Sequence, residues 1–103
     1  MSGFVLHPAA YIDLDEIREF IASDNPAAAD RVIDEIYEAI RSLVVFPHMG
    51  RTRADLTSRA LRFHLVREFL VAYVPEAKPL VVIAVLHGRR NPRVIVGLLR
   101  ERE

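Results

Sequence analysis

Cysteine is absent from this sequence of 103 residues, so the chain can form neither a disulfide framework nor a thiolate metal site. The longest purely apolar run, residues 80–86, is much shorter than the roughly 20 residues of a membrane-spanning helix. The N-terminus lacks a basic segment followed by a hydrophobic core, so we expect no signal peptide. These absences favour a cytoplasmic protein that does not bind membranes.

Lysine is nearly absent as well, because Lys78 is the only lysine among 14 basic residues. Residues 1–50 contain nine acidic residues and three arginines, a net charge of −6, whereas residues 51–103 contain eleven basic and five acidic residues, a net charge of +6. Arginine favours planar, bidentate contacts with carboxylates and phosphates. Either the C-terminal half binds an acidic partner, or the two halves neutralise each other in the fold or on its surface.

The composition, with 51% hydrophobic and 27% charged residues, is that of a single folded domain over residues 1–103. Residues 3–7 form a short apolar run that Pro8 ends, which predicts a first strand. Apolar side chains then recur every three or four residues, which predicts an amphipathic helix over residues 9–23.

A second helix has the clearest periodicity in the chain. Asn25 can cap it, Pro26 suits its first position, and Pro47 and Gly50 end it. Its apolar positions follow helical spacing: Ala29, Val32, Ile33, Ile36, Ile40, Leu43 and Val44. Because only a few residues separate the two helices, they should form an antiparallel hairpin.

The second half of the sequence changes period. Leu61, Phe63 and Leu65 alternate with more polar residues, which predicts a half-buried strand. The continuous apolar run of the last strand predicts a central position, covered on both faces. The expected segments are a loop over 51–59, strands over 61–66, 69–74 and 80–87, and a short helix rather than a strand over 94–102. The order is therefore β-αα-βββ, an α+β domain in which one antiparallel sheet packs against the helical hairpin.

Standard catalytic motifs are missing from the sequence, including HExxH, a glycine-rich phosphate loop and a nucleophile elbow. The four histidines lack the paired spacing of a metal site, so we expect no metal and no cofactor. Asp15 and Glu19 lie four residues apart on the first helix, a spacing that would suit a carboxylate pair. Together with Asp13 and Glu16, they are interpreted as the solvated side of that helix.

The polar residues of the C-terminal half form the most informative group. Arginine, histidine and tyrosine can together bind a phosphate, activate a 2′-hydroxyl and stabilise the transition state of RNA cleavage. A ribonuclease could be built from Arg62, His64, Tyr73 and His87. The alternatives are an exposed sheet face with a half-buried Tyr73, or a basic surface that binds a protein or nucleic acid without chemistry. Residues considered for such binding are Arg62, Arg67, His87, Arg89 and Arg90.

Six segments, in this order, resemble the RelE/ParE superfamily of toxins. The first three are residues 4–10 (Phe-Val-Leu-His-Pro-Ala-Ala), 25–29 (Asn-Pro-Ala-Ala-Ala) and 46–51 (Phe-Pro-His-Met-Gly-Arg). The others are residues 62–63 (Arg-Phe), 70–73 (Leu-Val-Ala-Tyr) and 85–92 (Val-Leu-His-Gly-Arg-Arg-Asn-Pro). The resemblance covers residues 4–92 and implies the RelE/ParE toxin fold.

The resemblance is closest to the ParE branch, because lysine is nearly absent, no tyrosine follows Tyr73 and the helical hairpin is long. It implies a toxin of a type II toxin–antitoxin (plasmid stabilisation) system that a ParD-like antitoxin neutralises and that inhibits DNA gyrase. Operator DNA would be contacted only through the antitoxin. The seam between the hairpin and the sheet is the groove in which we expect the antitoxin to bind. The alternatives are a RelE-type endoribonuclease that cuts mRNA on the ribosome, and an inactive antitoxin-binding module.

Overall fold

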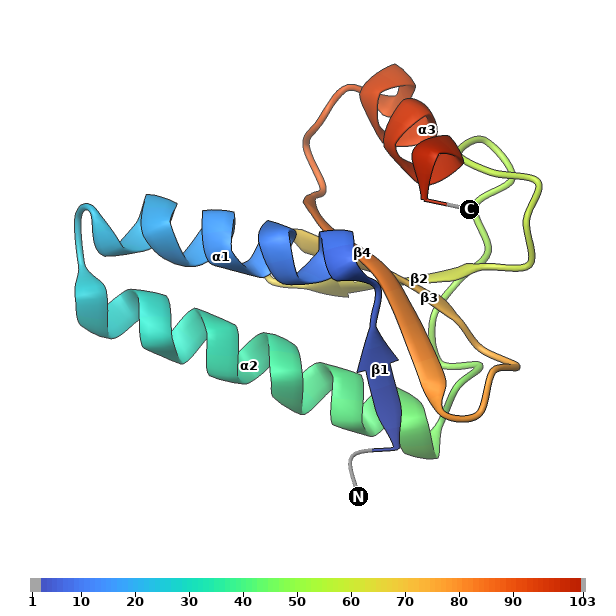
Figure 1. The fold of residues 1–103 in the computed structure, drawn as a ribbon, viewed down its shortest axis with the longest axis horizontal. Coiled ribbons are helices and arrows are strands. Elements are labelled where there is room, and N and C mark those ends of the chain that lie inside the picture. The colour runs from blue at the N-terminus through green and yellow to red at the C-terminus, as the bar shows by residue number, and fades with distance from the viewer. Residues whose placement is uncertain (1–2, 103) are drawn as a thin grey trace.

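The computed structural model describes residues 3–102 and has three helices and a four-stranded sheet (Figure 1). The α+β class predicted from the sequence is confirmed. In chain order the elements are β1 (Phe4–Leu6), α1 (Pro8–Ala22), α2 (Pro26–Val45), β2 (Arg62–Val66), β3 (Phe69–Val74), β4 (Leu80–His87) and α3 (Pro92–Glu101).

All three helices begin in the same way, with a polar residue that caps the helix followed by proline. The caps are His7, Asn25 and Asn91, and each side chain accepts a hydrogen bond from a backbone N–H of the first turn. The proline that follows needs no hydrogen-bond partner for its nitrogen at the first helical position. The sequence therefore fixes the start of each helix locally.

The sheet has the strand order β1-β4-β3-β2. The strands β2, β3 and β4 form an antiparallel meander, as predicted. The expectation of a wholly antiparallel sheet was wrong, because β1 pairs in parallel with β4, Phe4 facing Leu80. The helical hairpin and the strands β2 and β3 separate β1 from β4 in the sequence. In the sheet, β1 is an edge strand and runs in the same direction as its neighbour β4.

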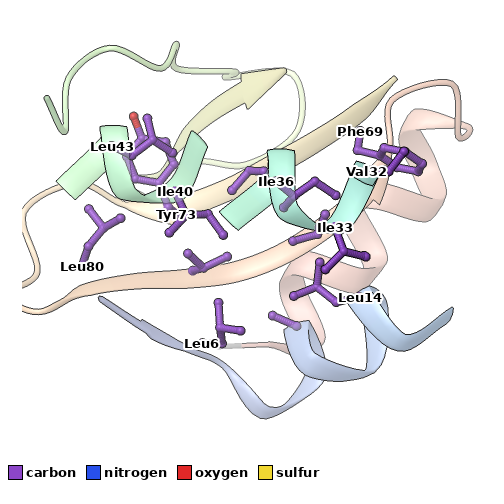
Figure 2. Packing of buried hydrophobic residues seen from close by; sticks show 14 residues of the cluster. Leu6, Leu14, Val32, Ile33, Ile36, Ile40, Leu43, Phe69, Tyr73 and Leu80 are labelled. Atoms are coloured by element: carbon purple, nitrogen blue, oxygen red, sulfur yellow. The ribbon is translucent and has the colours of Figure 1, made fainter. Parts of the chain in front are cut away.

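The main core lies between the helical hairpin and one face of the sheet. Figure 2 shows the side chains of α2 gathered against those of the strands, with Ile36, Ile40 and Tyr73 completely buried. Burial of one such isoleucine side chain stabilises the fold by about 1.5–3 kcal/mol. The periodic apolar positions of α2 therefore account for the attachment of the hairpin to the sheet.

The opposite face of the sheet has a core of its own, which the sequence did not predict. Here α3 and the loop before β2 cover the strands, with Ile95 and Leu99 of α3 buried beside Leu56 and Phe63. The expectation that all helices lie on one face was therefore wrong. The central position predicted for the last strand is confirmed, because β4 is buried on both faces. Within residues 3–102, no helix combines the length and apolar character of a membrane span.

Candidate interaction groove and the C-terminal basic residues

A groove of about 370 Å³ runs along the seam between α1 and the sheet. Its helical wall carries Ile17, Phe20 and Ile21, and its sheet wall is formed where β3 begins and β4 ends. Phe20 stands at its margin with 81% of its surface exposed. The remaining lining residues are Asp13, Glu16, Glu68, Phe69, Val85, Leu86, His87 and Arg90. An open apolar wall with charged residues of both signs is suited to a peptide that is apolar on one side.

His87 closes the groove at the end of β4. Its Nδ1 accepts a hydrogen bond from the backbone N–H of Arg89 at 3.2 Å, and its Nε2 lies 3.6 Å from a carboxylate oxygen of Glu68. The ring also makes an edge contact with Phe69, with 5.5 Å between the ring centroids. Nδ1 of His87 therefore holds the loop that follows β4, and Nε2 lies beside the turn between β2 and β3.

Arg89 and Arg90 lie in the loop between β4 and α3 and are both exposed. Arg90 lines the groove. Within residues 3–102, neither guanidinium makes a hydrogen bond or an ion pair. These two arginines are therefore the residues of the predicted binding set whose charge is most open to a partner.

Arg67 has a different environment, in the two-residue turn between β2 and β3. Its φ of 57° is in the left-handed region, which is uncommon for a residue with a side chain. Its guanidinium donates two hydrogen bonds to a carboxylate oxygen of Glu35 on α2. These bonds hold the pKa of Glu35 below its ordinary value of 4.5. This exposed pair joins the basic half of the chain to the acidic half.

Tyr73 and Arg62 hold the loop that follows α2. The Tyr73 hydroxyl donates to the carbonyl of Pro47 at 2.6 Å and accepts from the N–H of Gly50 at 2.9 Å. The Arg62 guanidinium donates to the Gly50 carbonyl at 2.7 Å. Burial raises the pKa of Tyr73, partly offset by the Gly50 N–H. The interpretation of Tyr73 as half-buried was wrong, because its exposed fraction is 0% and its hydroxyl is fully used inside the protein.

The four residues considered for RNA cleavage lie on one face of the sheet, but they do not form a cluster. Arg62 faces Tyr73 across β2 and β3, whereas His87 faces Phe69. Phe69 and Tyr73 are four residues apart, which corresponds to roughly 13 Å along a strand. His64 lies between these two ends, opposite Val71. No three histidine, aspartate or glutamate side chains within residues 3–102 are placed to hold a metal ion.

Asp13 is buried, although it was predicted to lie on the solvated side of α1. Its exposed fraction is 8%, and its carboxylate accepts hydrogen bonds from the backbone N–H of Val85 at 3.0 Å and from Arg102 at 2.6 and 2.9 Å. The expectation of a solvated side chain was wrong for Asp13, although Asp15 and Glu19 are exposed as predicted. A signal was present, because Asp13 lies three residues after Ala10 and four before Ile17, on the apolar side of the helix.

The chain matches a known protein family. A family described as "ParE toxin of type II toxin-antitoxin system, parDE" matches residues 4–92, which is most of the chain. No match was found among curated proteins. The matched region contains β1, the helical hairpin, the three-stranded meander and the loop that carries Arg89 and Arg90.

Proposed function

This chain belongs to the ParE toxin family of type II toxin–antitoxin systems, and we propose that it acts in the cytoplasm by inhibiting DNA gyrase. We further propose that a ParD-like antitoxin neutralises it by folding onto its surface. The chain would contact operator DNA only through that antitoxin. The single observation that supports this proposal best is the family match over residues 4–92. The groove lies within the matched region.

The groove along α1 supports binding of an antitoxin segment. A segment that folds only on binding has to offset the entropy of ordering, which requires buried apolar surface and matching charges. Ile17, Ile21 and the exposed Phe20 offer the apolar surface. Arg90 at the margin offers a cation for an acidic side chain of the antitoxin. We therefore assign to this groove an amphipathic segment that places an acidic side chain beside Arg90.

The placement of the basic residues favours gyrase over mRNA as the target. An endoribonuclease needs its acid, its base and its phosphate ligands around one phosphodiester. Tyr73 is buried and bonded to the backbone, and His87 lies roughly 13 Å along the sheet from it. Inhibition through a surface requires no such cluster. Arg89 and Arg90 are our candidates for the gyrase or antitoxin contact, with Arg62, Arg67 and His87 holding the structure around them.

Changing Arg89 and Arg90 together to alanine tests this proposal. The wild-type protein should inhibit supercoiling of relaxed plasmid by purified gyrase, and the double variant should require a roughly tenfold higher concentration for the same inhibition. The free energy of unfolding should change little, because both side chains are exposed.

The matched control is the double change Arg31→Ala and Arg41→Ala, which removes the same charge from exposed positions on α2. This control should inhibit gyrase as the wild type does. Equal inhibition by the Arg89/Arg90 variant would refute the surface assignment. No effect of the wild-type protein on gyrase would refute the proposed target.

A further inference from the structure

The outer edge of β2 has an open backbone position. Phe63 uses its outward N–H and carbonyl to bond with Arg51, at 2.7 and 2.8 Å. Because hydrogen-bonding direction alternates along an antiparallel strand, the N–H and carbonyl of Leu65 also point outward, away from β3. No backbone group within residues 3–102 bonds with them. The outer edge of β2 is therefore paired with Arg51 at Phe63 and open at Leu65.

A hollow of about 690 Å³ borders this open position. Phe63 and Leu70 supply apolar surface, and Leu65 contributes a side chain that is 59% exposed. The other lining residues are Met49, Arg51, Arg53, His64 and Gly88. The hollow shares none of its lining residues with the groove along α1. A strand added beside Leu65 would have room for a side chain in this hollow.

The charge of the hollow favours an acidic occupant. Arg51, Arg53 and His64 are its only titratable lining residues, so no acidic side chain lines it. Arg53 is held by two hydrogen bonds to Asp55 at 2.9 and 2.8 Å, which offsets its charge. The guanidinium of Arg51 makes no ion pair with any residue from 3 to 102. Arg51 is thus the principal cation that a bound carboxylate would meet.

We propose that this open edge and its basic hollow bind an extended, acidic peptide segment of a partner protein, which pairs its backbone with Leu65 and places a carboxylate beside Arg51. A peptide strand offers both a donor and an acceptor at the spacing of the sheet, which matches the two backbone groups of Leu65. A nucleic acid would use the arginines through its phosphates but would leave the N–H and carbonyl of Leu65 without strand pairing. The site is independent of the proposed gyrase inhibition.

Leu65→Pro is the sharpest test, because proline removes the outward N–H without removing a bond to β3. The probe is a fluorescein-labelled octapeptide in which glutamate and valine alternate, followed by fluorescence anisotropy. The wild type should bind it saturably, and Leu65→Pro should bind it roughly five- to tenfold more weakly. Leu65→Ala keeps the N–H, so its affinity for the peptide should fall less than that of Leu65→Pro. Arg51→Gln should weaken binding several-fold.

Equal binding by Leu65→Pro and the wild type would overturn the proposal, as would the absence of saturable binding to the wild type. Tighter binding of a labelled octauridylate at the same hollow would also overturn it, in favour of nucleic acid. If Leu65→Pro fails to fold, amide hydrogen exchange in the wild type tests the same backbone pairing. The Leu65 amide should exchange more slowly when the glutamate–valine peptide is present, and an unchanged rate would contradict the proposed pairing.

Discussion

Changing Asp13 to alanine should lower the free energy of unfolding by about 3–5 kcal/mol, the range found when one partner of a buried ion pair is removed. The side chains of Asp13 and Arg102 are only 9% and 11% exposed. Loss of the carboxylate would leave the guanidinium of Arg102 and the backbone N–H of Val85 without their partner. The last turn of α3 would also lose its link to α1.

Urea denaturation followed by circular dichroism measures this change, and Asp15→Ala is the matched control on the exposed side of the same helix. The control should change the free energy of unfolding by less than about 0.5 kcal/mol. Adding Arg102→Ala to Asp13→Ala should restore part of the loss, because it removes the uncompensated charge. A loss below about 1 kcal/mol for Asp13→Ala would show that the pair does not hold α3 in solution.

The second large effect is expected at Tyr73. Tyr73→Phe should lower the free energy of unfolding by about 2–3 kcal/mol, because the buried Gly50 N–H and the partly buried Pro47 carbonyl both lose their partner. The contact is close, since a Cβ added at Gly50 would lie only 2.5 Å from the Tyr73 hydroxyl oxygen. The loop between α2 and β2 should therefore loosen.

Thermal and urea unfolding measure this effect, with Tyr11→Phe as the control because Tyr11 is 56% exposed. The same variant separates a structural tyrosine from a catalytic one. If Tyr73 has a structural role, Tyr73→Phe should be less stable but should still inhibit gyrase at temperatures where it is folded. Unchanged stability combined with complete loss of toxicity would indicate a chemical role and would contradict the account given for Tyr73.

Local sequence signals were enough to predict most elements of the fold. Pro8, and Asn25 followed by Pro26, mark where the hairpin helices begin, and the apolar spacing along α2 identifies the face that it buries. The change to period two at residues 61–65 marks the meander. Each of these signals depends on neighbours within a few residues, so it can be read without knowledge of the rest of the structure.

Long-range pairing could not be predicted in the same way. The parallel partner of β1 lies more than 70 residues away at Leu80, and three residues of apolar sequence do not specify which edge they join. Similarly, the burial of Asp13 is stabilised by Arg102, which lies at the opposite end of the chain. The full burial of Tyr73 could not be predicted either, because its hydrogen-bond partners belong to a loop whose course has no periodic signal.

The most direct test of the proposed function is pulse-labelling of DNA and protein synthesis in a bacterial host, minutes after this chain alone is induced. Inhibition of gyrase predicts that DNA synthesis fails first, with broken chromosomes and continued translation, and that co-expression of the cognate antitoxin prevents both. If translation stops first and transcripts are cut, the gyrase proposal is contradicted and the chain acts as a ribonuclease.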